Sequence, residues 1–388
     1  MIGALIIAIA ASAILIKTLV GYSAFSLGTK LTISLVIVVA WFAPVFIWGI
    51  RHFHLAGNSS VYTFVSNIGY YLFGTAFILL ILVVLRDFVW FVVYDVLKWS
   101  KSASAAAFNP SLVPILNKAN LITVIIALLL SFYGLWGALK EPALNEVRIA
   151  TPKIEREFRA LQLSDLHINR TTPVSKVKAL VERVNALKPD VILLTGDIID
   201  DRVGAVIPQM EALRQLDAPY GVQMVYGNHE FYSGLLPWQR KFSKMGFNLL
   251  FNNGLRLGET GIYVGGIPDA GTIKQNRFFK LNVRRALENR SVNDYVIFLS
   301  HTPNLDEKEI DDGRIDLLLS GHTHGGQIFP FHLLVQKANK YLAGMYDING
   351  TSLYVSRGAG YWGPPMRLFA PSEITLFRLF PERLPLSD

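Results

Sequence analysis

The sequence predicts two regions of different fold class: an N-terminal all-α transmembrane region of about four helices, and an α/β domain after it. The 388 residues are 52% hydrophobic and only 17% charged, whereas an average soluble domain is roughly a quarter charged. Residues 1–140 contain two acidic side chains and eight Lys and Arg, while the rest of the chain contains 27 acids and 29 bases. Beyond residue 158, short apolar runs alternate with stretches of helical period, which is typical of α/β sheets.

The same observations define the expected domain organisation and exclude several classes of protein. We expect a transmembrane region at residues 1–140, a charged linker at 141–157 and a domain at 158–388. The apolar content excludes intrinsic disorder, and the absence of cysteine excludes a disulfide scaffold or a thiolate metal site. The net charge of +8 resides mostly in the first region, so it does not indicate a nucleic-acid partner.

The first region contains four apolar stretches, each near the roughly 20 residues that a helix needs to cross a bilayer. The first lacks a preceding basic segment and an evident cleavage site, so we interpret it as a retained span rather than a signal peptide. Arg86 and Asp87 interrupt the third stretch, and we expect their charged groups to reach water at the interface. The expected spans are Ile2–Val20, Leu31–Ile50, Ile68–Tyr94 and Leu121–Leu139.

The second region alternates strand-like runs with helical stretches and then continues with further strand-like runs. Helices are expected at Val174–Leu187 and Ile207–Leu216, which have the apolar spacing of amphipathic helices. The later runs have fewer helices between them, which suits a second sheet. Strands are expected at Phe158–Leu163, Val191–Leu194, Val222–Tyr226, Ile262–Gly265, Tyr295–Leu299, Ile315–Leu319, Leu353–Ser356 and Ile374–Phe377.

Side chains that bind metal ions follow strand after strand. Since ligands of open α/β sheets bind beyond the carboxyl ends of the strands, we expect these side chains to meet in one place. Each short motif alone is common in turns, but the ordered set is specific, and five of the eight histidines fall in it. The candidate metal ligands are Asp165, His167, Asp197, Asn228, His301, His322 and His324, and His229 lies beside them.

The residue types and spacing of this set indicate the chemistry. Residues i and i+2 of an extended strand end point the same way, so we expect Asp165 with His167, and His322 with His324, to present paired ligands. Oxygen and imidazole ligands without thiolate suit Mn, Fe or Zn. Seven ligands exceed the needs of one ion, so we expect two divalent ions sharing a carboxylate. Such pairs are suited to phosphoester hydrolysis.

The ordered motifs Asp-x-His, Gly-Asp, Gly-Asn-His-Glu, His and Gly-His-x-His resemble those of the calcineurin-like metallophosphoesterase superfamily, over about residues 158–380. The long form Gly321–Gln327 and the ending Leu353–Gly358 look like its bacterial membrane-associated branch, which often carries N-terminal transmembrane helices. The resemblance implies a four-layer αββα sandwich. It also implies one ion on Asp165, His167 and His324, a second on Asn228, His301 and His322, Asp197 as the bridge, and His229 as the catalytic group that faces the phosphate.

Three further residues are weaker candidates. Many relatives have an Asp-Asp pair after the strand that follows the Asn-His-Glu motif, but this chain has a single acid there, Asp269. Asp269 is a candidate to orient a ligand histidine. Arg357 and Arg367 lie in a Gly- and Pro-rich stretch, and each is a candidate to meet a phosphate, although structural arginines are as common.

These observations predict a membrane-anchored, metal-dependent phosphoesterase in which water or hydroxide on the metal pair attacks phosphorus. The substrate is a phosphomonoester or phosphodiester, and apolar residues 328–346 beside the Gly-Gly turn suit a lipid-linked one. A nuclease or nucleotide phosphodiesterase is one alternative, disfavoured by the nearly neutral second region. A membrane sensor or scaffold with a structural metal site is another. The sequence does not define the oligomeric state.

The distribution of lysine and arginine around the spans predicts the orientation. Basic residues concentrate between the first and second spans and between the third and fourth, and such loops are typically cytoplasmic. With an even number of spans, the N-terminus and the catalytic domain then both lie outside the cytoplasm. We therefore expect a multi-pass protein of the plasma (inner) membrane with an extracytoplasmic catalytic domain.

Overall fold

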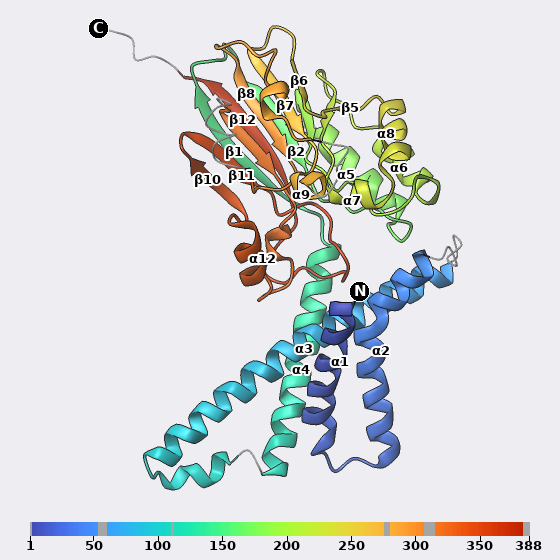
Figure 1. The fold of residues 1–388 in the computed structure, drawn as a ribbon, viewed down its shortest axis with the longest axis vertical. Helices are drawn as coiled ribbons and strands as arrows, with labels where there is room; N and C mark the ends of the chain where they lie inside the picture. Colours follow the sequence, from blue (N-terminus) through green and yellow to red (C-terminus); the bar gives the residue numbers. More distant parts are fainter. Residues whose placement is uncertain (1, 53–59, 110–111, 275–279, 306–314, 383–388) are drawn as a thin grey trace. The chain divides into compact units, whose positions relative to one another are not determined.

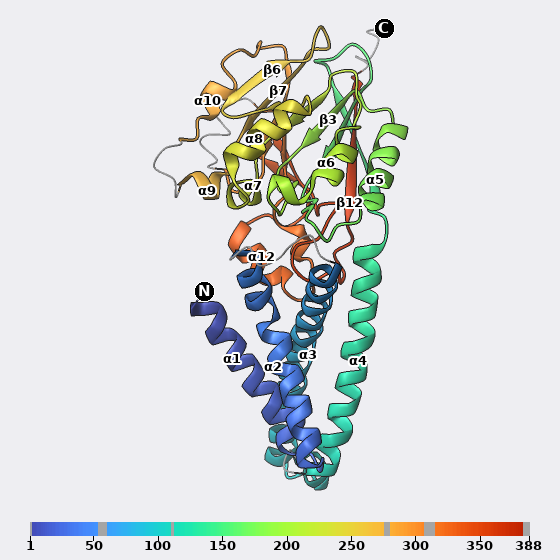
Figure 2. The same ribbon diagram turned by 90° about the vertical axis from the view of Figure 1, so that its right-hand side faces the viewer.

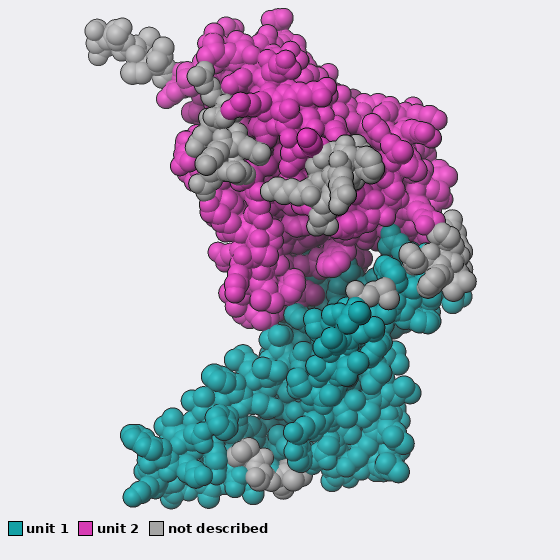
Figure 3. Space-filling model, viewed as in Figure 1, with its two compact units in different colours: residues 1–136, 363–368 teal, residues 137–362, 369–388 magenta. Residues whose placement is uncertain are grey.

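The computed structural model describes residues 2–52, 60–109, 112–274, 280–305 and 315–382, which divide into two units (Figure 3). Unit 1 comprises residues 1–136 and 363–368, and unit 2 comprises residues 137–362 and 369–388. The last residues of the fourth long helix therefore belong to unit 2. A short segment from far along the chain, residues 363–368, belongs to unit 1.

Unit 1 is built from long apolar helices, four of which are long and apolar enough to cross a membrane. The predicted spans fall inside these helices, which extend beyond the predicted ends by up to eight residues. Between α1 and α2 the chain forms a five-residue π-helix, η1. The elements are α1 (Ile2–Ile16), η1 (Lys17–Gly21), α2 (Leu27–His52), α3 (Ser60–Trp99), the 3₁₀-helix η2 (Ala103–Phe108) and α4 (Val113–Leu139).

Arg86 differs from the expectation that its charged group reaches water. Its side chain is only 15% exposed, and its guanidinium donates to Asn120 Oδ1 at 2.7 Å and to Thr123 Oγ1 at 3.3 Å. The physical reason is that two polar residues one turn apart on α4 supply acceptors inside the unit. Which helices lie side by side is not encoded in local hydropathy.

Residues 363–368 pack against the long helices within unit 1. A side chain added at Gly74 of α3 would meet Met366 Sδ at 2.7 Å, and one added at Gly134 of α4 would meet Met366 Cβ at 3.4 Å. The Arg367 N–H donates to the Gly134 carbonyl at 2.8 Å. Two glycines on α3 and α4 thus provide the space that the segment occupies.

Unit 2 contains two six-stranded sheets, ordered β1-β12-β2-β3-β4-β5 and β10-β11-β9-β8-β7-β6. In the first sheet β2, β3, β4 and β5 are parallel neighbours, and in the second β7, β8, β9 and β11 are parallel. The strands are β1 (Ala143–Thr151), β2 (Phe158–Leu163), β3 (Val191–Leu194), β4 (Val222–Met224), β5 (Asn248–Leu249), β6 (Asn253–Arg256), β7 (Ile262–Ile267), β8 (Tyr295–Ser300), β9 (Leu317–Ser320), β10 (Gly344–Ile348), β11 (Thr351–Val355) and β12 (Glu373–Pro381).

Helices cover the outer faces of the two sheets, which gives the expected αββα layers (Figures 1 and 2). In α5, for example, Val177, Val181 and Val184 are buried on one face at helical spacing. A separate apolar core lies between the sheets. The helices are α5 (Val174–Ala186), α6 (Ile207–Leu213), α7 (Asn228–Tyr232), α8 (Leu235–Lys244), α9 (Ala270–Lys274), α10 (Val283–Ala286) and α12 (His332–Asn339), with 3₁₀ turns η3 (Val203–Ala205) and η4 (His324–Gly326).

The expected linker at residues 141–157 is largely a strand. β1 forms the edge of the first sheet and pairs in parallel with β12 over nine residues. Its side chains alternate, with Val147 and Ile149 packed toward the core between the sheets and Glu146 paired with Arg378. Charges on the exposed face of an edge strand resemble a linker by composition, and the partner strand lies about 230 residues away.

Candidate metal centre

The predicted metal ligands lie at one edge of the sandwich, where the parallel strands of both sheets end. We call it the metal edge and define it by the carboxyl ends of β2, β3, β4, β8 and β9. A candidate ligand follows the end of each of these strands within one to four residues. The residues brought to this edge are Asp165 and His167 after β2, Asp197 after β3, Asn228 and His229 after β4, His301 after β8, and His322 and His324 after β9.

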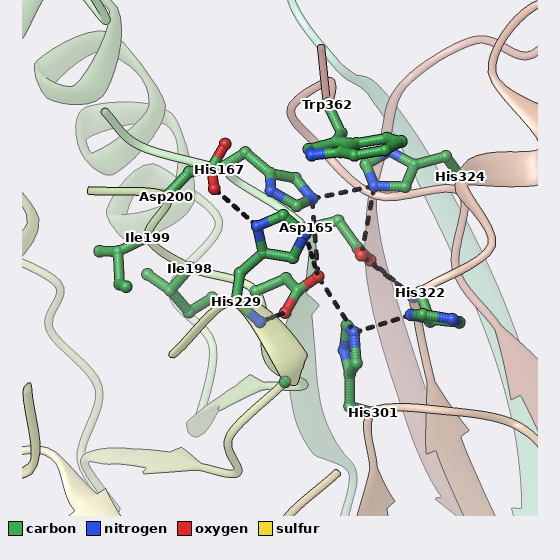
Figure 4. Close-up of polar contacts among 12 residues, drawn as sticks. Asp165, His167, Ile198, Ile199, Asp200, His229, His301, His322, His324 and Trp362 are labelled. Carbon is green, nitrogen blue, oxygen red and sulfur yellow. Dashed lines mark hydrogen bonds and ion pairs between the residues drawn. The ribbon is translucent and has the colours of Figure 1, made fainter. Parts of the chain in front are cut away.

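Three overlapping groups of side chains have ligand atoms close enough to hold a metal ion (Figure 4). Within each group, one ligand atom per residue lies within 4.8 Å of the others. Two of them share Asp197, whose Oδ2 lies 3.2 Å from His301 Nε2 and 3.7 Å from His167 Nε2. The groups are Asp165, His167 and His324; His167, Asp197 and His229; and Asp197, His301 and His322.

Ring nitrogens converge in this cluster in a way that favours bound cations. His167 Nε2 lies 3.0 Å from His324 Nε2, and His322 Nδ1 lies 3.2 Å from His301 Nε2. His301 places its Nδ1 2.8 Å from the Thr195 carbonyl, so Nδ1 donates a proton there and Nε2, which lies 3.2 Å from Asp197 Oδ2, is the nitrogen that faces the cluster. Two imidazole nitrogens at these distances need a proton or a metal ion between them, because two lone pairs directed at each other repel.

Asn228 provides an independent test of fit to a metal. Its Oδ1 is buried and accepts no hydrogen bond from any residue that the structure describes. A buried, unpaired amide oxygen costs roughly 1–3 kcal/mol, whereas the same oxygen is a suitable ligand for a divalent ion. The residues present therefore fit a divalent metal centre built from carboxylate, amide and imidazole ligands.

The backbone at the ligands differs from the extended geometry that the i and i+2 spacing suggests. Asp165, His167 and Asp197 have φ of 54°, 47° and 53°, and His322 and His324 have φ of 70° and 52°. Left-handed non-glycine residues cost of order 1–3 kcal/mol each and cluster at functional sites. The paired ligands converge because alternate residues are left-handed, which reverses the chain sharply. Side-chain types do not reveal this.

Two glycines are required for the loops to approach one another. Gly196 has φ of 92°, and a side chain on it would meet the backbone nitrogen of Gly227 at 2.6 Å and His301 Nδ1 at 2.7 Å. A side chain at Gly227 would in turn collide with the Asp197 carboxylate. Only glycine at both positions allows the loops after β3 and β4 to hold Asp197 between them.

Burial and charge divide the histidines into two kinds. Burial lowers the pKa of His167 to about 3 and of His322 to about 4, so both are neutral and able to bind metal. Burial also opposes protonation of His301, but the adjacent Asp197 carboxylate raises the pKa of His301 well above its usual value. Burial raises the pKa of Asp165 to about 6, with the His301 charge opposing it. In the absence of metal, protons on His301 thus compensate part of the buried negative charge.

His229 is held differently from the candidate ligands. Its Nδ1 lies 2.6 Å from Asp200 Oδ1, and its Nε2 lies 3.9 Å from Asp197 Oδ2. Burial lowers its pKa, but the hydrogen bond to Asp200 and the charge of Asp197 outweigh burial and raise the pKa to about 9. His229 can therefore carry a proton at neutral pH, directed by Asp200.

Asp200 and Glu230 are functional candidates that the sequence reasoning missed. Buried Glu230 accepts hydrogen bonds from the backbone N–H groups of Asp197 at 2.9 Å, Ile198 at 2.8 Å and Gly227 at 2.7 Å. It therefore fixes the two loops that carry Asp197 and His229. The signals were present, because Asp200 follows Asp197 by three residues and Glu230 ends the Asn-His-Glu motif.

Trp362 is a further residue near the site that the sequence reasoning did not select. Its indole is 54% exposed, and its ring centroid lies 6.0 Å from that of His229. The Gln327 side chain holds its backbone, donating to the Trp362 carbonyl at 2.8 Å and accepting from its N–H at 2.9 Å. Tyr232, 72% exposed, is the last residue of α7, and its ring lies 5.5 Å from that of His229 on the same helix. The catalytic candidate thus has two exposed aromatic neighbours.

The three weaker candidates have different surroundings. Asp269 is buried at the metal edge, where its Oδ2 accepts the Thr272 N–H at 2.7 Å and its Oδ1 has no hydrogen-bond partner among the described residues. Arg357 lies beside Gly325 but pairs with Glu373 at 2.7 Å. Arg367 is buried and belongs to unit 1, whereas all the candidate ligands belong to unit 2. A substrate role for any of the three stays a prediction.

Comparison with known proteins places this geometry among metallophosphoesterases. Residues 158–326 match the family of calcineurin-like phosphoesterases. An uncharacterized metallophosphoesterase of Helicobacter pylori strain J99 is 37% identical over 250 residues, which cover 64% of this chain and 67% of that protein. A metallophosphoesterase of Bacillus subtilis is 33% identical over 232 residues, 57% of this chain and 79% of that protein.

A relative that is described as a transmembrane protein also matches. A Danio rerio protein described as a transmembrane protein with a metallophosphoesterase domain is 32% identical over 289 residues. The match covers 71% of this chain and 65% of that protein. It therefore extends beyond the residues that match the phosphoesterase family.

Proposed function

The chain belongs to the calcineurin-like metallophosphoesterase family, and on that premise we propose that it hydrolyses a phosphoester carried by a membrane amphiphile. It is a metal-dependent phosphoric ester hydrolase with apolar helices suited to a membrane. The proposal goes further in three respects: the roles of individual residues, the lipid-linked substrate and the orientation of unit 2.

We propose that the cluster binds two divalent ions, with Asp197 shared between them. One ion would be held by Asp165, His167 and His324, and the other by Asn228, His301 and His322. A pair of divalent ions supplies a deprotonated water as nucleophile at neutral pH and neutralises the phosphoryl oxygens in the transition state. The convergence of ring nitrogens on Asp197, together with the unpaired Asn228 Oδ1, supports this assignment.

His229 is proposed as the general acid. In the absence of metal its pKa of about 9 keeps it protonated at neutral pH, and its Nδ1 is oriented by Asp200 at 2.6 Å. The Nε2–H is then the group available to donate to the leaving oxygen of the ester. A positioned acid contributes roughly 10² to 10⁴ in rate.

One observation carries the choice of a membrane substrate: the strand that follows α4 begins at the metal edge. β12 is antiparallel to β2, and β1 is parallel to β12, so β1 runs opposite to β2. By register, Ala143 of β1 pairs with Glu373 of β12, two residues before Thr375, which pairs with Gln162 near the carboxyl end of β2. Leu139, the last residue of α4, precedes Ala143 by four residues, at most about 14 Å of chain.

The second connection between the two units, at residues 363–368, supports the same conclusion. Residues 363–368 leave unit 2 between Trp362 and Phe369, and Trp362 adjoins His229. Both connections of unit 2 to the apolar helices therefore depart from the metal edge. An ester at the surface of the bilayer would be within reach of the site without leaving the membrane.

The experiment compares esters that differ only in their apolar part. Full-length protein in nanodiscs with added Mn²⁺ should hydrolyse a long-chain glycerolipid phosphate or its diester with a higher kcat/KM than the short-chain, water-soluble analogue. Asp197→Asn in the same nanodiscs is the control for contaminating phosphatase. Equal kcat/KM for the two chain lengths would overturn the lipid-linked substrate, and preference for polynucleotides would favour a nuclease. Metal analysis of the purified protein would distinguish Mn, Fe and Zn.

The orientation is tested separately. We propose that unit 2 lies outside the cytoplasm, on the basis of the basic residues at and near the connections from α1 to α2 and from α3 to α4. A phosphatase reporter that is active only outside the cytoplasm, fused after Asp388, should be active. An inactive reporter, with a fluorescent cytoplasmic fusion at the same position, would place the site at the cytoplasmic leaflet.

A further inference from the structure

Exposed apolar side chains gather on the loop and helix that follow the last two metal-ligand candidates. We use the name apolar patch for six residues of unit 2 that have large side chains at least 42% exposed. Contiguous exposed apolar surface on a protein marks a site of contact with another apolar phase. The six residues are Phe329, Phe331, Leu333, Leu334, Trp362 and Phe369.

Direct contacts join the two chain segments that form the patch. The Phe329 ring lies 5.9 Å from the Phe369 ring. Two residues before Phe329, Gln327 holds the backbone of Trp362 through both its amide nitrogen and its amide oxygen. The patch therefore combines residues 329–334 with Trp362 and Phe369, all within unit 2.

The patch is next to the catalytic candidates. Trp362 is the patch residue whose ring adjoins His229, at 6.0 Å. The other segment of the patch begins three residues after Gly326, where the turn that carries His324 ends. A partner that contacts the patch consequently lies next to His229 and the metal centre.

The covalent connections of Trp362 and Phe369 indicate what the apolar patch contacts. Trp362 and Phe369 are the residues on either side of the segment 363–368, which packs within unit 1 against Gly74 and Gly134. Gly134 precedes the end of α4 by five residues, about 7.5 Å along the helix axis. Each of these two aromatic residues is thus one peptide bond away from chain packed near the end of a membrane-spanning helix.

The charges around the patch suit a lipid surface. From Gly321 to Tyr346 the sequence has no acidic residue, whereas it has Lys337 at the end of α12 and Lys340 just after it. A short helix with exposed Leu and Phe beside lysines has the composition of segments that lie in the bilayer interface. A tryptophan at its margin is typical of the headgroup region.

We propose that the apolar patch enters the headgroup region of the bilayer that holds α1–α4 and keeps the mouth of the metal centre against the lipid surface. The partner is the membrane itself. The inference concerns a surface, and it holds whichever ester is hydrolysed, so its test uses no substrate.

The absence of cysteine from the chain makes a single-label experiment direct. A nitroxide attached to Leu334→Cys, in nanodiscs of zwitterionic and anionic phospholipids, should be accessible to oxygen and shielded from a water-soluble nickel chelate. The expected depth is about 5–10 Å below the surface, as for interfacial helices. Val292→Cys is the matched control, because Val292 is apolar, 73% exposed and lies before the start of β8, at the opposite end of the strands.

Each outcome decides the proposal. Shielding of Leu334 with full nickel access at Val292 supports it. Equal nickel access at both positions would overturn it. Dipolar coupling between labels at Leu334 would also overturn it, because that result means a second copy of the chain covers the patch. Metal content equal to that of the unsubstituted protein verifies that each labelled variant is folded.

Discussion

Both units contain buried polar side chains, but the two clusters pair differently. In unit 1, the Arg86 cluster matches donors with acceptors: Arg86 donates to Asp87 and Asn120, and Asn120 donates to the Thr18 carbonyl at 2.9 Å. Thr18 lies in the π-helix η1, whose wider turn leaves a carbonyl available. In unit 2, imidazole nitrogens face one another at 3.0 and 3.2 Å.

The difference indicates how a structural polar cluster is distinguished from a functional one. Both clusters include buried polar side chains, and intramembrane charge is by itself a reason to suspect function. The Arg86 cluster satisfies its own hydrogen-bonding groups and binds three helical segments together. The cluster in unit 2 directs acceptors at a common point, which is stable only with protons or cations present. Acceptors that converge on one point are thus better evidence for a functional site than burial or charge alone.

The largest effect should come from the residue on which the acceptors converge. Asp197→Asn should lower metal content toward one ion or none and reduce kcat/KM by more than the roughly 10⁴-fold that losing one acid or base costs. The measurement is metal stoichiometry together with steady-state hydrolysis of a chromogenic phosphate ester with added Mn²⁺. Asp201→Asn is the control, since Asp201 is equally buried but pairs with Arg170 at 2.7 Å. A metal-replete, active Asp197 variant would refute the bridging role.

Removal of His229 should separate catalysis from metal binding. His229→Ala is expected to lose roughly 10² to 10⁴ in kcat and to keep the metal content of the wild type, because His229 is paired with Asp200 rather than reserved for an ion. The same two measurements apply. Loss of metal from this variant would instead make His229 a ligand.

Asp200→Asn should have a smaller effect that depends on pH. Burial lowers the pKa of His229, while the Asp200 hydrogen bond and the Asp197 charge raise it, to about 9 in the metal-free protein, so the acid form is lost as pH rises through the pKa. Without the Asp200 charge, the fall of kcat at high pH should move to lower pH. If the pKa of His229 drops by about one unit, the protonated fraction at pH values above the pKa falls up to about tenfold. The pH profiles of kcat for variant and wild type test this. A uniform loss of activity with no shift of this fall would indicate a purely structural role for Asp200.

The smallest effect should come from the cluster in unit 1. Asn120→Leu removes hydrogen bonds to Arg86 and to the Thr18 carbonyl and should cost about 1–2 kcal/mol of stability. Thermal unfolding in detergent measures the loss. Activity per bound metal should be unchanged, and a large fall in it would mean that the Arg86 cluster has a function beyond holding helices together.

Much of this architecture follows from local sequence. β2 and β3 coincide with the predicted strands, and the four long helices contain the predicted spans. The candidate ligands converge because each directly follows a parallel strand. Local pattern accounts for these features since strand ends and apolar runs are short-range properties.

Other features depend on contacts between distant residues. β1 was expected as a linker because its partner β12 lies about 230 residues away. The left-handed backbone at Asp165, His167 and Asp197 is imposed by loops that cross one another. The role of Glu230 depends on three N–H groups from two loops. None of these has a signature in composition or periodicity.

The placement of residues 363–368 in unit 1 determines how the protein can be divided. A single cut near residue 140 would leave a C-terminal fragment that still carries Met366 and Arg367 packed on Gly74 and Gly134, so the two fragments should remain associated. A gene shortened to begin at residue 137 would expose that apolar segment without its partners. A soluble version therefore needs a redesigned loop between Trp362 and Phe369, and a single junction near residue 140 would separate residues 363–368 from Gly74 and Gly134.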